Sequence, residues 1–166
     1  MKFYLVDHIQ ELEPPDRLVA VKNLTLAEEY LADHFPSYPV LPGVLMLEAL
    51  VQSAAWLVRV AREFEPTLIL LKEARNVRYG AFVRPGGQLV MEVTAKEIGE
   101  QTSTFKALGR CQDKTAVQAR LVLEHGTVAN EEPGGDRIDD RLRTFWQERF
   151  ALIGGPQALA AGAGAS

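Results

Sequence analysis

A proline-free and largely apolar stretch from about Gly43 to about Phe64 constrains the fold of this chain more than any other segment. It contains no proline, helix-forming residues dominate it, and apolar side chains occur on nearly every side until Arg59. A helix that is apolar all round must be surrounded by other protein. The chain is therefore predicted to build its core around one long central helix.

Segments with the composition of β-strands stand on both sides of this helix. They are expected at residues 4–13, 17–24, 67–77, 88–98, 102–111 and 115–124, with a short helix at 26–33. Short turns rich in glycine, proline and aspartate separate most of them, so antiparallel pairing of neighbours is the simplest arrangement. The central helix is the natural cover for the apolar face of such a sheet.

The chain has 166 residues, which fits one globular domain with an appendage. We expect a main domain at 1–126, a linker at 127–136, an amphipathic helix at 137–152 and a disordered tail at 153–166. The apolar stripe of that last helix consists of Ile138, Leu142, Phe145, Trp146 and Phe150. This stripe must dock on the chain's own core or on a partner.

Composition excludes several classes of protein. The net charge of −4 and the lack of a basic stripe argue against a nucleic-acid partner. A single cysteine, Cys111, cannot form an internal disulfide, and no His/Cys cluster has metal-ligand spacing, so no metal or other cofactor is expected. The N-terminus lacks the pattern of a signal peptide, and polar residues interrupt the central apolar stretch. A soluble, cytoplasmic protein without a membrane span is the natural interpretation.

Two polar residues stand within the central helix. Glu48 is surrounded by apolar residues, and burying a carboxylate without a partner costs several kcal/mol. Gln52 follows four residues later and therefore lies on the same helix face. The structural alternative to a catalytic acid is a glutamate that lies at a solvated helix end or forms an ion pair with a buried arginine.

A stiff loop leads into this helix. Three prolines between His34 and Gly43 forbid regular helix there and hold the chain extended. A lone loop histidine is more often a surface residue than a catalyst, but this loop ends where free N–H groups at the helix start can bind a carbonyl oxygen. A base, an acid and an oxyanion site are thus expected to converge.

The residues of this loop and helix resemble the signature of the β-hydroxyacyl-[acyl carrier protein] dehydratases of fatty acid synthesis. The matching positions are His34, Phe35, Pro36, Pro39, Val40, Pro42, Gly43, Val44, Leu45, Glu48, Ala49 and Gln52. Further matches occur at Leu5–Asp7, Lys22–Asn23, Asn76–Tyr79 and Val83–Gly86, so that the resemblance covers about residues 3–125. It implies an α+β hotdog fold, in which an antiparallel sheet of about six strands wraps around a long helix, and an obligate dimer.

The resemblance also implies roles for individual residues. His34 would be the catalytic histidine and Glu48 the catalytic acid of the partner chain. The Gly43 N–H would bind the thioester carbonyl beside Val44, and Gln52 would support Glu48 in the substrate site.

The implied reaction converts a (3R)-hydroxyacyl thioester into a trans-2-enoyl thioester. The partners would be the acyl carrier protein that bears the substrate and a second copy of the chain, as a homodimer or a trimer of dimers. Glutamate at the acid position resembles the branch of the family that does not isomerise the product.

Asp33, Ser37 and Gly87 depart from the family's pattern, and a charged Asp33 beside the histidine would alter or weaken the activity. Two alternatives therefore stay open. One is a hotdog thioesterase, and the other is a non-catalytic hotdog dimer that binds acyl chains or a carrier protein.

Overall fold

The predicted central helix is α1, Gly43–Ala61, in a computed structural model that describes residues 3–163. It starts directly after Pro42, which cannot continue a helix in the N-terminal direction. It ends three residues before the predicted Phe64, because Glu63 and Phe64 adopt positive φ angles of 52° and 62° that no α-helix accommodates. Most of its residues between Met46 and Arg59 are buried.

Six strands form one antiparallel sheet. They are β1 (His8–Glu13), β2 (Arg17–Asn23), β3 (Leu68–Tyr79), β4 (Gln88–Ile98), β5 (Thr102–Cys111) and β6 (Lys114–Gly126), in the spatial order β1-β2-β4-β5-β6-β3. The predicted pairing of sequence neighbours is confirmed for β1–β2, β4–β5 and β5–β6. It is wrong for β3 and β4, because residues 80–87 form a long connection that carries the chain across the sheet, and β3 pairs with β6.

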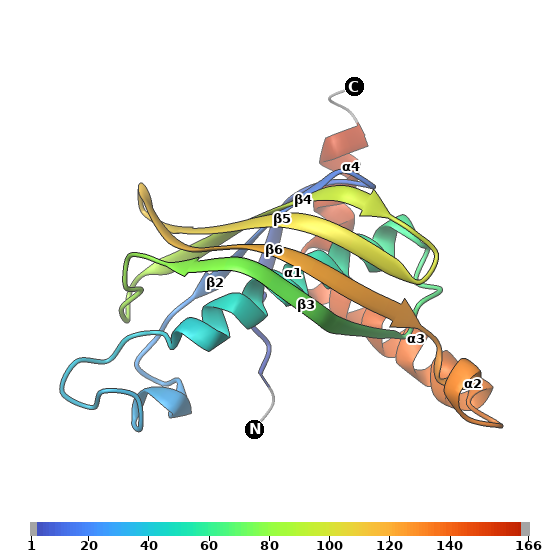
Figure 1. Cartoon of the computed structure of the whole chain (residues 1–166), viewed down its shortest axis with the longest axis horizontal. Helices are drawn as coiled ribbons and strands as arrows, with labels where there is room; N and C mark the ends of the chain where they lie inside the picture. The colour runs from blue at the N-terminus through green and yellow to red at the C-terminus, as the bar shows by residue number, and fades with distance from the viewer. Residues whose placement is uncertain (1–2, 164–166) are drawn as a thin grey trace.

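The sheet curves over α1, and the core lies between them (Figure 1). Fully buried side chains of both layers meet there, among them Leu50 and Leu57 of the helix and Met91, Phe105 and Leu121 of the sheet. The α+β hotdog architecture expected from the sequence is therefore confirmed for the single chain. Among the described residues α1 alone is long and apolar enough to cross a membrane, but 61% of its most apolar window is buried in the protein, as in a core helix.

The loop before α1 projects from one end of the molecule (Figure 1). The short helix expected at 26–33 is a single 3-10 turn, η1, at Glu29–Leu31. Residues 35–42 form no regular secondary structure, as the three prolines predict.

Three helices follow the sheet in the described part of the C-terminal segment, up to residue 163. The short α2 (Val128–Glu131) lies in the segment expected to be a linker, α3 (Asp136–Leu152) matches the predicted amphipathic helix, and α4 is Gly155–Ala163. The prediction of a disordered tail differs from the structure at α4, since its alanines favour helix and Ala158 is buried. Residues 164–166 of that predicted tail lie outside the described residues.

The helix α3 docks on its own chain. The rings of Trp146 and Phe150 contact Trp56 of α1, and Phe150 also contacts Phe64. The C-terminal part of the predicted stripe therefore packs on α1, whereas Ile138 and Phe145 of the same stripe are exposed.

Candidate active site

His34 is oriented by a backbone carbonyl within its own loop. Its Nδ1 lies 3.2 Å from the Val40 carbonyl oxygen, and its ring stacks edge-on against Phe35, with centroids 4.4 Å apart. A carbonyl oxygen can only accept, so Nδ1 must carry the hydrogen. In the neutral imidazole Nε2 is then the unprotonated nitrogen, which is the form that a general base requires.

The loop itself is held in place at both ends. The His34 N–H donates to the Tyr30 carbonyl at 3.2 Å, and the Leu41 N–H donates to the Val83 carbonyl at 2.9 Å. Phe35 adopts a positive φ of 55°, which is a costly conformation for a bulky residue. The loop geometry therefore fixes where the histidine ring lies.

Glu48 is half-buried on α1 and is oriented by Gln52. The Gln52 amide nitrogen donates to Glu48 Oε1 at 2.9 Å and to the Phe3 carbonyl at 3.0 Å. Its amide oxygen accepts the Leu5 N–H at 2.9 Å, which sets the direction of the amide. The N-terminal segment thus fixes Gln52, and Gln52 fixes the carboxylate.

The first turn of α1 presents two free donors. The N–H groups of Leu45 and Met46 donate to the Pro42 carbonyl, whereas those of Gly43 and Val44 have no backbone acceptor in the described part of the chain. The Val44 side chain is 69% exposed, so this side of the helix start faces solvent. Free N–H groups and the positive end of the helix dipole together can stabilise a developing oxyanion.

Gly43 stands against an aromatic ring. A Cβ at this position would lie 3.2 to 3.4 Å from ring atoms of Tyr79. Any side chain here would have to displace the tyrosine, so glycine keeps the helix start open.

The structure brings together some of the predicted residues and leaves others apart. Glu48 and Gln52 form one hydrogen-bonded pair, and Gly43 and Val44 lie one turn before them on the same helix. Within residues 3–163 no hydrogen bond or ion pair joins His34 to Glu48, and Asp33 is exposed with no ion pair to His34. A single chain therefore holds both halves of the predicted machinery without joining them.

A cavity of about 210 Å³ adjoins Glu48 and Gln52. It runs along one face of α1 to Trp56 and Arg59, and α3 closes it with Trp146 and Arg149. Sequence reasoning missed Arg59 and Trp146 as site residues, because it treated the first as the end of the apolar stretch and the second as part of an apolar stripe. The signal was the spacing, since Arg59 follows Glu48 by eleven positions, close to three helical turns.

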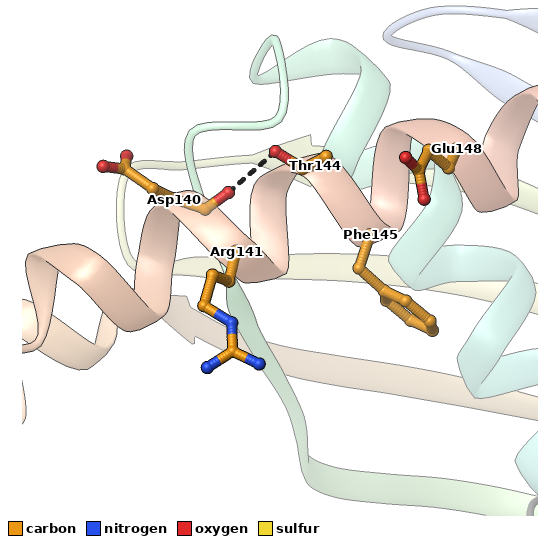
Figure 2. A pocket seen from close by; sticks show the side chains of 5 residues that line it. All are labelled: Asp140, Arg141, Thr144, Phe145 and Glu148. Carbon is orange, nitrogen blue, oxygen red and sulfur yellow. Dashed lines mark hydrogen bonds between the residues drawn. The ribbon is translucent and has the colours of Figure 1, made fainter.

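Other hollows do not contain the predicted catalytic residues. One of about 340 Å³ follows the outer face of α3, and all five side chains that line it come from that helix (Figure 2). Another of about 640 Å³ lies between Tyr38 of the proline-rich loop and the ends of β5 and β6. Among residues 3–163 no group of histidine, cysteine, aspartate or glutamate side chains has the arrangement of a metal site.

Comparison with known sequences assigns the first three quarters of the chain to a protein family. Residues 1–124 match the family described as the FabA-like domain. The 3-hydroxyacyl-[acyl-carrier-protein] dehydratase FabZ of Burkholderia mallei is 39% identical over 121 residues, which cover 71% of this chain and 78% of the relative. The protein of the same name from Burkholderia thailandensis is 40% identical, with 71% and 76% covered.

Solved structures share the fold at low identity. The dehydratase heterocomplex ApeI:P from Xenorhabdus doucetiae aligns with a TM-score of 0.62 and 17% identity, covering 74% of this chain and 83% of the other. A thioesterase from Haemophilus influenzae aligns with a TM-score of 0.56 and 16% identity, covering 71% and 76%. These likenesses concern the fold alone, because hotdog proteins with different activities share it.

Proposed function

The chain belongs to the FabA-like family, and from this premise we propose that it dehydrates 3-hydroxyacyl thioesters carried by acyl carrier protein in fatty acid biosynthesis. It is a hydro-lyase whose product is the trans-2-enoyl thioester. The observation that carries the proposal is the position of Glu48, fixed by Gln52 and one turn beyond two free N–H groups. An acid and an oxyanion site thus share one helix.

The first step is removal of the α-proton by His34 Nε2. Nδ1 is committed to the Val40 carbonyl, so Nε2 is the nitrogen with a free lone pair. As the C–H bond breaks, negative charge moves onto the thioester oxygen. The N–H groups of Gly43 and Val44 stabilise that charge, which lowers the barrier to proton abstraction.

The second step is loss of the 3-hydroxyl group as water. Glu48 donates the proton, and the electron pair of the former C–H bond forms the double bond between C2 and C3. Gln52 holds the carboxyl group in one orientation, as a proton donor in a fixed geometry requires. Glutamate at this position goes with dehydration that is not followed by isomerisation.

The active unit is a dimer, in which His34 of one chain faces Glu48 of its partner. Support comes from the lack of a hydrogen bond or ion pair between the two residues within residues 3–163, and from the exposed Phe35 and Val44 side chains near them. β3 pairs on one side only in the described chain, and Leu70 and Leu71 on it are 65% and 39% exposed. An unpaired strand edge with exposed leucines is a natural place for a second copy to join the sheet.

Acyl carrier protein docks beside the proline-rich loop. Arg84 lies over the Tyr38 ring at 4.2 Å and, with Lys114, lines the hollow next to this loop. Neither cation has a carboxylate partner among the described residues, whereas Lys72 and Arg75 are paired with Glu124 and Glu73. An acidic carrier protein would find its counter-charges here, in a soluble cytoplasmic enzyme that needs no cofactor.

The direct test follows the reverse reaction with a crotonyl or longer 2-enoyl thioester. The purified protein should remove the enoyl absorbance, and both His34→Ala and Glu48→Gln should abolish this change. Full activity in either variant would overturn the catalytic assignment. Release of free thiol without any change in the double bond would indicate a thioesterase instead.

A further inference from the structure

Arg59 is a buried cation without a counter-charge. It is 6% exposed, and its guanidinium lies over the ring of Trp146 at 3.9 Å and that of Trp56 at 5.3 Å. No carboxylate in residues 3–163 forms a salt bridge with it, and burial lowers its pKa to about 9. Cation–π contacts recover part of the lost hydration, but they leave the Arg59 Nε–H without an acceptor.

Two buried donors at this place have no acceptor. They are Arg59 Nε and the indole Nε1 of Trp146, and each is shielded from solvent. Leaving a buried donor unpaired costs roughly 1–3 kcal/mol, so each of these two N–H groups calls for a partner such as an ordered water or a bound anion. Both residues line the cavity that begins at Glu48.

The cavity changes character along its length. Its α1 wall begins with Glu48 and Gln52, continues with Val51 and Ala55, and ends at Arg59. Eleven residues of helix span about 16 Å. Ile69 adds a further apolar side chain, so the chemistry is polar at the catalytic end, apolar in the middle and cationic at the far end.

We propose that the acyl chain of the substrate ends in a carboxylate, which Arg59 and Trp146 bind at the far end of this cavity. The inference rests on the proposed function, since it places the thioester end of the same substrate at Glu48. An extended chain advances roughly 1.2 Å per bond, so a span of about 16 Å corresponds to about 13 bonds, or about 14 carbons counted from the thioester carbonyl.

The alternatives fit these groups less well. A plain alkyl chain would end in a methyl group and leave both donors dehydrated. A planar carboxylate matches the fork of a guanidinium and has a second oxygen for the indole N–H. Arg149, which lies over the Tyr4 ring at 3.9 Å, adds a second cation to the cavity, where Glu48 supplies the only acidic side chain among its described lining residues.

The helix α3 supplies the part of this site that lies outside the matched family segment. Trp146 and Arg149 lie beyond residues 1–124, whereas Arg59 lies within them. The C-terminal extension thus supplies two of the residues that would distinguish a carboxylate from a methyl group at the end of the acyl chain.

The test compares two fourteen-carbon 3-hydroxyacyl N-acetylcysteamine thioesters, one with a terminal carboxylate and one with a terminal methyl group. The wild-type protein should prefer the carboxylate, with kcat/KM about 10-fold to 100-fold higher, as expected for a charge-assisted hydrogen bond in a buried site. The 3-hydroxybutyryl thioester, which is too short to reach Arg59, reports the basal dehydration separately.

Three variants test which residues cause the preference for a terminal carboxylate. Arg59→Met keeps the length of the side chain, removes the charge and should abolish the preference while 3-hydroxybutyryl turnover persists. Trp146→Phe keeps an aromatic face for Arg59 but loses the N–H, and should reduce the preference only in part. Arg62→Met is the matched control, because Arg62 pairs with Glu65 at the same end of α1 and does not line the cavity.

A binding measurement separates this inference from the proposed function. Nonanoate should quench the tryptophan fluorescence of the wild-type protein at concentrations at which nonan-1-ol, which has the same chain without the charge, does not, whether or not any thioester turns over. Equal response to both compounds, or equal kcat/KM for the two fourteen-carbon thioesters, overturns the inference and leaves dehydration standing. Selective nonanoate binding that Arg59→Met removes supports the site even if no thioester is dehydrated, in which case the proposed function alone fails.

Discussion

Gln52 and Glu48 form a hydrogen-bonded pair one helical turn apart on α1, and the N-terminal segment holds Gln52 from the other side. All the hydrogen-bonding capacity of the Gln52 amide nitrogen is therefore in use, half of it on the carboxylate. The carboxylate has no comparable partner elsewhere in the described chain. Its orientation depends on this one amide.

Replacing Gln52 with leucine should reduce kcat without a matching rise in KM. The variant removes the group that orients Glu48 but not the free N–H groups of Gly43 and Val44 that are proposed to bind the thioester, and loss of one such hydrogen bond is worth roughly a 10-fold change. Steady-state rates with the 3-hydroxybutyryl thioester measure the two constants separately. Gln88→Leu is the control, since Gln88 bonds only to Asn23 on an exposed surface; a Gln52→Leu enzyme with wild-type kcat would contradict the positioning role.

The separation of His34 from Glu48 within one chain leads to a complementation test. Homodimers of His34→Ala and of Glu48→Gln each lack one member of both sites. A mixed dimer has one site with both residues intact and one with neither, so random assembly of equal amounts should restore about a quarter of wild-type activity.

Co-expression of the two variants with different affinity tags, followed by purification of the mixed dimer, gives the measurement, and this purified species should have about half of the wild-type activity per dimer because one of its two sites is intact. Recovery of activity on mixing supports a site shared between chains. A mixed dimer as inactive as its parents would show that each site lies within a single chain.

Adding a methyl group at Gly43 should affect catalysis more than folding. The new Cβ would press on the Tyr79 ring, which is 50% exposed and can move outward. Alanine also favours helix, so the free energy of unfolding should change by less than about 1 kcal/mol. The same methyl group stands beside the free N–H groups, and kcat/KM should fall by at least about 10-fold. Thermal melts and steady-state rates on one Gly43→Ala preparation measure the change in stability and the change in kcat/KM. An unchanged kcat/KM would show that Gly43 is not part of the oxyanion site.

Much of the fold could be predicted because its signals are local. The apolar stretch of α1, the alternation in β4 and β5, and the stripe on α3 each depend on residues close in sequence. The place of β3 at the sheet edge could not be predicted, because the sequence of residues 80–87 is compatible either with a hairpin between β3 and β4 or with a connection that crosses the sheet. The fate of the Ala/Gly-rich tail depended on its packing against β1, which composition does not reveal.

The residues of the candidate site also differ in how far the sequence predicts them. The Glu48–Gln52 pair follows from helical spacing, and the loop geometry around His34 follows from its prolines. The pairing of Arg59 with Trp146 joins residues far apart in the chain, and only the docking of α3 brings them together. Residues whose role arises from a tertiary contact leave little trace in a single sequence.

Asp139 anchors α3 to the rest of the chain. Its carboxylate accepts hydrogen bonds from the Thr67 hydroxyl and from the N–H groups of Val128 at 2.8 Å and Ala129 at 2.9 Å. Burial alone would raise the pKa of Asp139, but the hydrogen bonds from Thr67, Ala129 and Val128 outweigh it and hold the pKa below the ordinary value of 3.8.

Asp139→Asn should therefore destabilise the protein at neutral pH and weaken its response to acid. A carboxyl whose pKa is lowered in the folded state stabilises that state above the pKa of the unfolded chain, and the contribution disappears as pH falls through the folded pKa. Urea unfolding at pH 7 should show a loss on the order of 1–3 kcal/mol, and the difference from wild type should shrink below about pH 4. Asp140→Asn is the control, because Asp140 forms an exposed pair with Arg143 that is worth less than about 1 kcal/mol. A constant difference between Asp139→Asn and wild type from pH 7 to pH 3 would show that the charge of Asp139 does not hold α3 in place.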